Sequence, residues 1–360
     1  MEVNPPIVST GYSITIGPKA LRALEELLSR KYKNARFFIL VDENTARHCL
    51  PTLAAQVPML ADAHILEVES GEASKNIEVC TRLWRALGDL GADRQSVMLN
   101  LGGGVIDDMG GFVASTYKRG IPFIQLPTTL LAQVDASVGG KTGIDLDHLK
   151  NEIGLFSIPL GVFIWPDFLK TLSRREMISG FAEMVKHALI SDKDYWLELQ
   201  TVNMADAAVW DRLVYHSVFL KNEIVLADPT EKGIRKALNF GHTIGHAIES
   251  YYLENGEKRL LHGEAVAVGM IAEAYLSMTE NGLSRSELDT ITVFIRRNFG
   301  TIELEPLADH RLLELMRHDK KNENGVVNFT LLNRIGDCSI NKNALSGKVR
   351  DALNYYRGSL

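Results

Sequence analysis

Three histidines in the second half of the chain have the spacing of a metal site. His242 and His246 stand four residues apart, so they share one face of a predicted helix. His262 opens a later segment with helical periodicity. Imidazole nitrogens are common ligands of Zn2+. A pair of histidines at this spacing alone is equally typical of side chains that only form hydrogen bonds, so the neighbouring motifs decide the interpretation.

Glu183 is the acidic residue best placed to complete this site. Lys186 follows one helical turn later, so the carboxylate and the ammonium would point the same way. One Glu with two His leaves a coordination position open, as in catalytic zinc sites, whereas structural zinc sites usually have four ligands rich in Cys. Cys49, Cys80 and Cys338 lack such spacing. The pattern therefore favours a catalytic metal.

A glycine-rich turn predicts a second kind of site. Gly102 to Val105 follow an apolar run and precede a predicted helix, so a pyrophosphate could approach the backbone there. The spacing is not GxGxxG, and tight strand-to-helix packing is the alternative. Gly71 to Lys75 precede another helix, and Pro127 to Leu131 bring paired hydroxyls after a strand. Asp42 ends a further apolar run and could accept from a ribose hydroxyl, although such residues more often cap a helix.

Lysines and arginines next to these motifs predict an anion pocket. The Gly-Lys-Thr that contains Lys141 resembles the end of a P-loop, but Asp135 stands where a P-loop needs its first glycine, which excludes an NTPase. Each of the other cations also lies beside another motif, so together they would hold carboxylate and phosphate groups. They are Lys150, Lys186, Lys221, Arg235, Lys320 and Lys321.

The whole chain has the composition of a soluble globular protein. Its 360 residues, 46% of them hydrophobic and 23% charged, are enough for two domains. The 39 Lys and Arg against 45 Asp and Glu give a net charge of −6, which provides no general attraction for nucleic acid or an anionic membrane. No apolar run approaches a membrane span, and the start lacks a signal-peptide pattern. We therefore expect a cytoplasmic location.

The pattern of apolar residues divides the chain into two halves. Strand-like runs alternate with helical segments in the first half, which predicts an α/β domain with a mostly parallel sheet over residues 1–172. These runs are 35–41, 63–68, 96–101, 122–126 and 161–165. Helical periodicity dominates from about Ser173, which predicts an all-α domain over 173–360, apart from a short strand within Val326 to Leu332. We expect a cleft between the domains.

The chain resembles the 3-dehydroquinate synthases, within the sugar phosphate cyclases. The likeness runs from about Tyr12 to Tyr356. It rests on motifs that follow one another in the family's order, namely Gly102 to Asp108, Arg119-Gly120, Pro127 to Thr142, Lys150-Asn151, Glu183 to Lys186, Arg235 to His246, His262 to Glu264 and Asp319 to Lys321.

This resemblance implies an NAD-binding α/β domain, a helical domain that binds Zn2+ or Co2+, and a homodimer. The implied reaction of aromatic amino acid biosynthesis, in the shikimate pathway, converts 3-deoxy-D-arabino-heptulosonate 7-phosphate to 3-dehydroquinate and phosphate. It would proceed by transient oxidation with NAD, phosphate elimination, re-reduction and intramolecular aldol closure. The substrate is an anionic sugar phosphate, and neither nucleic acid nor a membrane is an implied partner.

The resemblance also assigns roles to individual residues. Glu183, His242 and His262 correspond to the metal ligands, and Glu231, His246 and Lys186 to catalytic positions. The implied substrate contacts are Arg119 (reaching the neighbouring subunit), Asp135, Lys141, Asn151, Lys221, Arg235, Asn239, Lys320 and Lys321. The implied NAD contacts are Asp42, Glu72, Lys75, Gly103, Gly104, Val105, Asp108, Thr128, Thr129 and Lys150.

Three departures from the family pattern concern loops. Asp107 stands where the family usually has Gly, which would place a negative charge beside the dinucleotide loop unless the side chain points outward. The loop Asp145 to Leu149 lacks the usual Pro and Gly, and an insertion at Asn255 to Leu260 lengthens the gap between two predicted ligands.

Three alternative functions remain open at this point. A related cyclase would act on a sugar phosphate without a carboxylate, against which Lys141 and Arg235 argue. A metal-dependent polyol dehydrogenase would need net NAD turnover and would have no phosphate for the lysines to bind. An NAD-binding regulatory protein would not need the acid/base groups.

Overall fold

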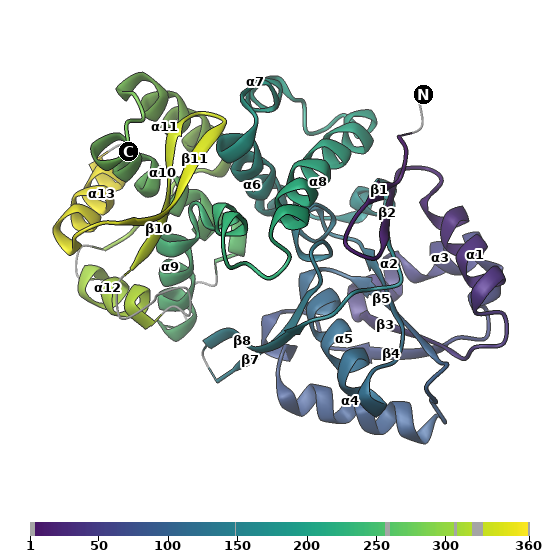
Figure 1. Cartoon of the computed structure of the whole chain (residues 1–360). Coiled ribbons are helices and arrows are strands. Elements are labelled where there is room, and N and C mark those ends of the chain that lie inside the picture. The colour runs from purple at the N-terminus through teal and green to yellow at the C-terminus, as the bar shows by residue number, and fades with distance from the viewer. Residues whose placement is uncertain (1–3, 148, 256–259, 306–307, 319–326, 359–360) are drawn as a thin grey trace. The chain divides into compact units, whose positions relative to one another are not determined.

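The chain forms two compact units in the computed structural model, which describes residues 4–147, 149–255, 260–305, 308–318 and 327–358. Unit 1 comprises Met1–Ser173 and Met204–Asn222, and unit 2 comprises Arg174–Asn203 and Glu223–Leu360. The elements of both units are labelled in Figure 1.

A single boundary between residues 172 and 173 does not describe this division, because Met204–Asn222 belongs to unit 1. The segment contains most of helix α8 (Trp210–Ala227). Its contacts explain the exchange, since the Asn222 Nδ2 donates to the Val8 carbonyl at 3.0 Å and Lys221 binds Asp135. The assignment of one cofactor to each domain stays a prediction.

Unit 1 is built on a mostly parallel sheet, in the order β1-β2-β9-β6-β5-β3-β4 among the described residues. Among the described strands of this sheet, only the β1–β2 pair is antiparallel. The strands are β1 (Ile7–Val8), β2 (Ser13–Ile16), β3 (Phe37–Asp42), β4 (His64–Val68), β5 (Val97–Gly102), β6 (Phe123–Pro127) and β9 (Val162–Ile164). Each of the five predicted runs overlaps one of these strands to within a residue at its carboxyl end, which confirms the α/β class.

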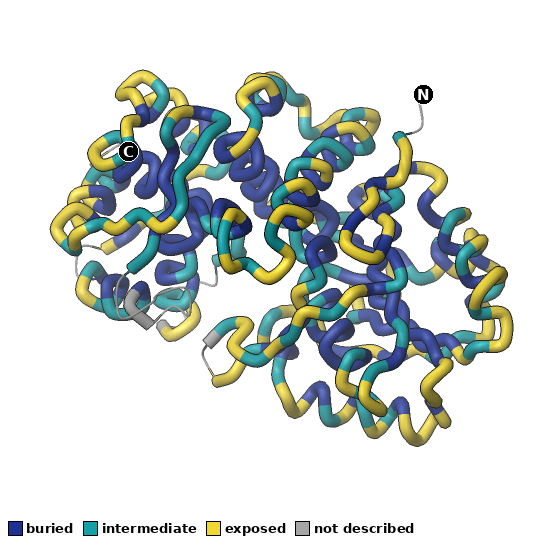
Figure 2. Tube along the Cα trace, viewed as in Figure 1, coloured by how far each residue is buried: buried dark blue, intermediate teal, exposed yellow. Residues whose placement is uncertain are grey.

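Helices cover both faces of this sheet. Along β3, Phe37 and Ile39 enter one hydrophobic core and Phe38 and Leu40 enter the other, as the two-residue period of a strand requires. Figure 2 shows the buried strands in dark blue. The helices are α1 (Ala20–Lys31), α2 (Glu43–His48), α3 (Leu50–Gln56), α4 (Ile77–Asp89) and α5 (Gly104–Thr116), and the shorter turns are η1 (Pro58–Leu60), η2 (Glu72–Ser74), η3 (Tyr117–Arg119), η4 (Ala132–Ala136), η5 (Pro166–Thr171) and η6 (Ala207–Val209).

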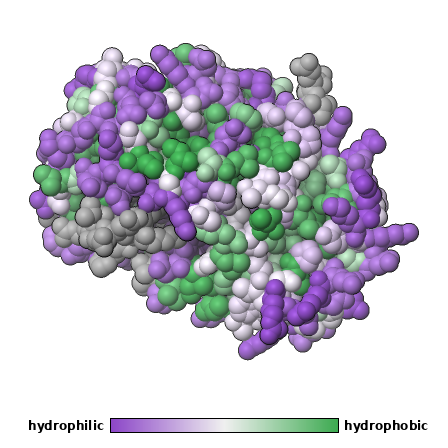
Figure 3. Space-filling model, viewed as in Figure 1, coloured by the Kyte–Doolittle hydropathy of each residue, from purple (hydrophilic) through white to green (hydrophobic). Residues whose placement is uncertain are grey.

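The α1 helix shows how the sequence pattern sets a buried face. Leu21, Leu24 and Leu28 are buried at spacings of three and four residues, and Leu24 and Leu28 are fully inaccessible. Charged residues occupy the opposite side, and Figure 3 shows hydrophilic side chains over this edge of unit 1. The helix therefore covers the sheet on one side and faces solvent on the other.

Strand order brings the predicted dinucleotide segments together. β3 pairs with β4 on one side and with β5 on the other, so the chain changes direction across the sheet at β3. Ligands of such sheets bind at the carboxyl ends of the strands beside this point. Asp42 ends β3, Gly102 ends β5, and Pro127 ends β6 directly opposite Gly102.

A separate antiparallel ribbon follows, formed by β7 (Lys141–Leu146) and β8 (Leu149–Phe156). The sequence pattern did not predict this ribbon, because the Gly-Lys-Thr at Lys141 resembles the end of a P-loop and Asp145 to Leu149 were expected to form a loop. Gly143 and Gly154 lie opposite each other in it, and a Cβ on Gly143 would lie 2.7 Å from the Ile153 carbonyl oxygen. The glycines therefore allow two strands to pair closely.

Unit 2 is rich in helices, as predicted. They are α6 (Arg174–Ser191), α7 (Lys193–Thr201), η7 (Ile234–Asn239), α9 (His242–Asn255), α10 (His262–Glu280), α11 (Arg285–Phe299), α12 (Asp309–His318) and α13 (Ser346–Gly358), together with the end of α8. The all-α expectation is wrong in one respect, because β10 (Asn328–Arg334) and β11 (Asp337–Asn343) form a hairpin. β10 overlaps the predicted short strand.

The α10 helix is the core of unit 2. It is buried along most of its length and packs against α6, α9, α11 and α13, so it carries apolar residues on all sides. None of the helices in the described part of the chain combines the length and apolar character that a bilayer crossing requires.

Asp107 does not point outward, as one reading of the sequence allowed, but is fully buried. On α5 it shares a face with Gly104, which approaches Ala136 of η4, and with Gly111, which approaches Thr142 of β7. Both carboxyl oxygens lack a hydrogen-bond partner among the described residues. Burial, and secondly the Asp108 charge, raises the pKa of Asp107 well above its ordinary value.

We predict that Asp107→Asn stabilises the protein at neutral pH but not in acid. Because the pKa of Asp107 is raised in the folded state, the unfolded chain ionises first, and stability falls as pH rises above about 4. Removing the acid removes that loss. The melting temperature of the variant should exceed that of the wild type by a margin that widens between pH 4 and 7.

The exposed Asp89, at the end of α4, provides the matched control. Asp89→Asn should track the wild type at every pH. A constant difference between Asp107→Asn and the wild type across this range would contradict the buried-acid explanation.

Candidate functional site

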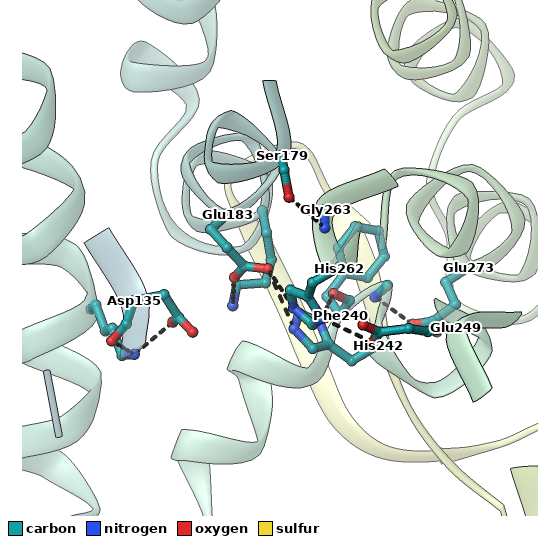
Figure 4. Close-up of polar contacts among 12 residues, drawn as sticks. Asp135, Ser179, Glu183, Phe240, His242, Glu249, His262, Gly263 and Glu273 are labelled. Carbon is teal, nitrogen blue, oxygen red and sulfur yellow. Dashed lines mark hydrogen bonds and ion pairs between the residues drawn. The ribbon is translucent and has the colours of Figure 1, made fainter. Parts of the chain in front are cut away.

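Three helices of unit 2 bring the predicted metal ligands together. Glu183 lies on α6, His242 begins α9 and His262 begins α10. The Glu183 Oε1 is 3.5 Å from the His242 Nε2 and 3.4 Å from the His262 Nε2, and Figure 4 shows both imidazoles facing the carboxylate. Ligands about 2.0 Å from a tetrahedral Zn2+ lie about 3.3 Å apart. The donor set therefore fits this ion.

His246 borders the same site. Its ring centroid lies 5.2 Å from that of His242 and 5.7 Å from that of His262. Ring nitrogens of the three histidines all lie within 4.8 Å of one another. His246 is thus close enough either to bind a metal or to exchange protons with a molecule bound there, and its acid/base assignment stays a prediction.

Buried charges compensate one another around Glu183. This carboxylate and Lys186 are 0% and 1% exposed and form an ion pair. Burial raises the pKa of Glu183, but Lys186 and His242 outweigh this effect and hold the pKa well below its ordinary value. Glu183 is therefore an anion, the form that a metal needs.

His262 carries a second carboxylate partner. Its Nδ1 lies 3.2 Å from the Glu249 Oε2, on the side of the ring away from Glu183. Burial lowers the pKa of His262, but hydrogen bonds with Glu183 and Glu249 raise it to about 9. A carboxylate behind a ligating imidazole fixes the orientation of the ring. Glu249 was missed by sequence reasoning because its contact with His262 depends on the packing of α9 against α10.

Glycines allow the helices to approach closely enough to form this site. A Cβ on Gly269 of α10 would overlap the Gly241 carbonyl and lie 2.8 Å from the Gly245 nitrogen. At the start of α10, Gly263 donates its N–H to the Ser179 Oγ at 3.0 Å, and a Cβ there would overlap the α6 backbone. The glycines beside the histidines in the sequence were the available signal for this packing.

The loop before α9 carries the other site residues predicted in unit 2. Asn239 Nδ2 donates to the Glu231 Oε1 at 3.1 Å, so these two residues lie together. Arg235, in η7, is only 2% exposed, and its Nη1 donates to the Pro229 carbonyl at 2.7 Å. This bond helps to fix the position of the buried guanidinium, and its contact with substrate stays a prediction.

Asp228 shapes this loop and was missed by sequence reasoning. Its carboxylate accepts backbone N–H bonds from Lys232, Gly233 and Arg235, at 3.0, 2.7 and 3.1 Å. Despite the opposing effect of burial, these bonds lower the pKa of Asp228. Glu231 in this loop has a left-handed backbone with a φ of 59°. The Asp228-Pro229 dipeptide was the available sequence signal for a turn here.

In unit 1, the glycine turn after β5 lies against the hydroxyl segment after β6. The Thr128 N–H donates to the Gly102 carbonyl at 2.8 Å, and a Cβ on Gly103 would lie 3.0 Å from the Thr129 Cγ2. Gly103 is the N-cap of α5, and glycine has no side chain that could accept a hydrogen bond there. The N–H groups of the first helical turn, including those of Gly104 and Val105, therefore receive no side-chain acceptor from the N-cap. Backbone donors and two hydroxyls thus border one edge of the sheet.

A charged cluster gathers four predicted NAD residues and one predicted substrate residue. Lys75 Nζ donates to the Asp108 Oδ2 at 2.6 Å and to the Asn151 side chain. Glu72 Oε1 lies 3.3 Å from the Lys150 Nζ. Burial lowers the pKa of Lys75, but Asp108, Glu72 and a third carboxylate raise it overall. Lys75 therefore stays a cation despite being buried.

That third carboxylate is Asp145, which sequence reasoning noted only as part of an unusual loop. The Asn151 N–H donates to its Oδ1 at 2.7 Å, and its own N–H donates to the Lys75 carbonyl at 2.8 Å. Burial and the Glu72 charge raise the pKa of Asp145 to about 6, with Lys75 opposing. Asp145 thus joins the β7–β8 ribbon to the Lys75 cluster.

Asp42 and Lys221 have clear structural roles in unit 1. Asp42 is the N-cap of α2 and accepts from the Thr45 N–H at 2.8 Å. This is the helix-capping role that the sequence offered as the alternative to a ribose contact. Lys221 donates to the Asp135 carbonyl at 2.5 Å and to its Oδ1 at 2.6 Å. Their contacts with ligands stay predictions.

The remaining predicted anion-binding residues differ in how far the structure describes them. Lys141 is exposed at the first residue of β7, and Arg119 is exposed in η3 with a left-handed φ of 70°. Lys320 and Lys321 lie outside the described residues. The insertion at Asn255 to Leu260 also lies largely outside them.

Comparison with protein families matches two consecutive family models to the chain. The 3-dehydroquinate synthase N-terminal model matches residues 65–179, and the 3-dehydroquinate synthase C-terminal model matches residues 180–322. A 3-dehydroquinate synthase from Parabacteroides distasonis is 45% identical over 339 residues, covering 93% of this chain and 95% of the relative.

Two solved structures resemble the whole chain. One is 2-epi-5-epi-valiolone synthase from Streptomyces hygroscopicus subsp. jinggangensis with NAD+ and Zn2+ bound, at a TM-score of 0.83, 26% identity and 99% coverage of both chains. The other is 2-deoxy-scyllo-inosose synthase complexed with carbaglucose-6-phosphate, NAD+ and Co2+. It has a TM-score of 0.84 at 22% identity, covers 98% of this chain and 99% of its own, and supports the fold alone.

We predict that Gly269→Ala disrupts the metal site through helix packing. The added methyl group would overlap the backbone at the start of α9, so α9 and α10 must separate. Overpacking of this kind costs about 1–3 kcal/mol of stability. Denaturant unfolding and titration of the metal-free protein with Zn2+ should show both lower stability and weaker binding.

Gly347→Ala is the matched control, because a Cβ at that position in α13 meets no atom within 4 Å. It should leave zinc affinity unchanged. Wild-type zinc affinity in Gly269→Ala would show that the glycine contact does not position the histidines.

Proposed function

The chain belongs to the 3-dehydroquinate synthase family, and from this premise we propose how its residues divide the work of the reaction. The enzyme converts 3-deoxy-D-arabino-heptulosonate 7-phosphate to 3-dehydroquinate by phosphate elimination and cyclisation. The observation that carries the division of roles is the convergence of Glu183, His242 and His262 on one point.

We assign the metal to these three residues. Their donor atoms have the separation of a tetrahedral zinc site, and the valiolone synthase relative was solved with NAD+ and Zn2+. Co2+ accepts the same nitrogen and oxygen ligands. When bound, zinc would acidify a substrate hydroxyl and NAD would accept and return its hydride.

We assign NAD to the carboxyl edge of the unit 1 sheet and to the Lys75 cluster. The uncapped glycine turn supplies backbone donors for a pyrophosphate, and the hydroxyls of Thr128 and Thr129 border it. The full set of proposed contacts is Asp42, Glu72, Lys75, Gly103, Gly104, Val105, Asp108, Thr128, Thr129 and Lys150.

Acid/base work falls to His246, Glu231 and Lys186 in this proposal. His246 adjoins the metal ligands, and an imidazole can donate or accept a proton near neutral pH. The buried Lys186 ammonium keeps Glu183 anionic and adds positive charge where an oxyanion would develop. Glu231 is held by Asn239, so its carboxylate has a fixed position.

The remaining polar residues are assigned to the substrate. Arg235 and Lys141 would hold the carboxylate of the substrate. A related cyclase whose substrate lacks a carboxylate would not need this contact. The proposed set is completed by Asp135, Asn151, Lys221, Asn239, Lys320, Lys321 and Arg119, with Arg119 reaching the partner subunit of a homodimer. Both the homodimer and a cytoplasmic location remain predictions.

Sequence identity favours 3-deoxy-D-arabino-heptulosonate 7-phosphate as the substrate over those of the alternative functions. Identity is 45% with the 3-dehydroquinate synthase relative and 26% with the valiolone synthase. A polyol dehydrogenase would not need the buried Arg235, and a regulatory protein would not need the converging ligands. A related cyclase is the second candidate, and a dehydrogenase the third.

The direct test supplies 3-deoxy-D-arabino-heptulosonate 7-phosphate to the purified protein with NAD and Zn2+ and measures the release of phosphate. We expect phosphate and dehydroquinate to appear together, without lasting NADH absorbance, because oxidation and re-reduction balance in each turnover. No phosphate release from this substrate, with metal and NAD bound, would favour another sugar phosphate. NADH accumulation with polyols would favour a dehydrogenase.

We predict that His242→Ala and His246→Asn separate metal binding from catalysis. His242→Ala should lose bound zinc and activity together, since it removes a ligand. His246→Asn should retain stoichiometric zinc yet lose about a hundredfold or more in turnover, the usual loss for an acid/base group. Metal analysis and initial rates provide the readouts. Loss of zinc from His246→Asn would instead make His246 a ligand.

A further inference from the structure

The peptide group between Phe240 and Gly241 has both polar atoms engaged beside the metal site. Its carbonyl oxygen lies 3.0 Å from the His242 Nδ1, and its N–H donates to the Glu273 Oε2 at 2.7 Å. These two atoms belong to one planar unit, so the direction of one fixes the direction of the other. Glu273 thereby determines where the acceptor for His242 points.

The carbonyl contact sets the tautomer of His242. A carbonyl oxygen only accepts, so Nδ1 must carry the proton. In the neutral ring, Nε2 is then the atom with the free lone pair, and it is Nε2 that faces Glu183 at 3.5 Å. The peptide thus holds His242 in the form that can bind a metal.

Glu273 also caps the helix that carries His242 and His246. Its Oε1 accepts from the Ile244 N–H at 3.0 Å. The first N–H groups of a helix need acceptors, and Gly241, with a φ of 79°, has no side chain to provide one. A fully buried carboxylate from α10 supplies this cap from a different helix.

His262 shows the direct version of the same device. Glu249 contacts its Nδ1 without an intervening group. His242 instead has a carboxylate that acts through one peptide, and the same carboxylate anchors the first turn of α9. Two buried glutamates outside the ligand set therefore stand behind the two imidazoles.

We propose that Glu273 is a positioning residue, which orients His242 for metal binding through the Phe240–Gly241 peptide. This inference rests on the proposed metal role of His242. Without Glu273, the peptide can rotate and the α9 start loses two hydrogen bonds. The Nε2 of His242 would then no longer point at the metal position. Loss of supporting contacts of this kind weakens metal affinity about ten- to a hundredfold.

The test compares Glu273→Gln with the wild type in the full chain. Glutamine keeps the shape but has one acceptor oxygen, so its NH2 group would face one of the two N–H donors. We expect chelator competition to give a Zn2+ dissociation constant about ten- to a hundredfold higher than that of the wild type. We also expect an altered visible spectrum of the Co2+-loaded protein. Glu280→Gln, on the exposed end of the same helix, should match the wild type in both measurements.

Melting of the metal-free proteins separates positioning from general stability. A lower melting temperature with wild-type zinc affinity and Co2+ spectrum would overturn the proposal, because it would show a structural role only. If Glu273→Gln does not fold, Glu273→Asp decides, since it keeps the charge but shortens the reach, and wild-type values for it would also overturn the proposal. A wild-type protein that binds no zinc would overturn the metal assignment itself, before any variant is compared.

Discussion

Burial of the Glu183 carboxylate is the constraint on which the candidate metal site depends. A buried anion is costly unless cations or hydrogen bonds compensate it. Here Lys186 and the imidazoles of His242 and His262 surround it, and each comes from a helix that must reach the same point. A divalent ion would complete this compensation. The same requirement accounts for the glycines of α9 and α10, since a single added methyl group would separate the donors.

Much of the fold follows from local patterns in the sequence. The buried strands β3, β5 and β6 appear as continuous apolar runs, and the glycine turn after β5 lies at the carboxyl edge where the strand order reverses. The histidine spacing likewise places two imidazoles on one face of α9. These features depend on residues close together in the chain. The sequence pattern therefore contains enough information to predict them.

The supporting residues could not be predicted in this way. Glu249, Glu273 and Asp145 each contact a partner on a different element, and nothing in their local sequence distinguishes them from exposed acids. The β7–β8 ribbon was missed for a related reason, because its glycines are typical of loops as well as of closely paired strands. Asp107 illustrates the converse, since its local context left its direction open and only the folded structure shows that it is buried.

The return of Met204–Asn222 to unit 1 has a consequence for how the protein is made. The chain passes from one unit to the other at residues 173, 203 and 222, so unit 1 lacks Lys221 and most of α8 until α6 and α7 have been synthesised. Asp135, which is partly buried and binds Lys221 of α8, must wait for that segment. Neither unit is a continuous stretch of chain. A ribosome therefore cannot release the first unit complete before it begins the second, and no single cut yields both units intact.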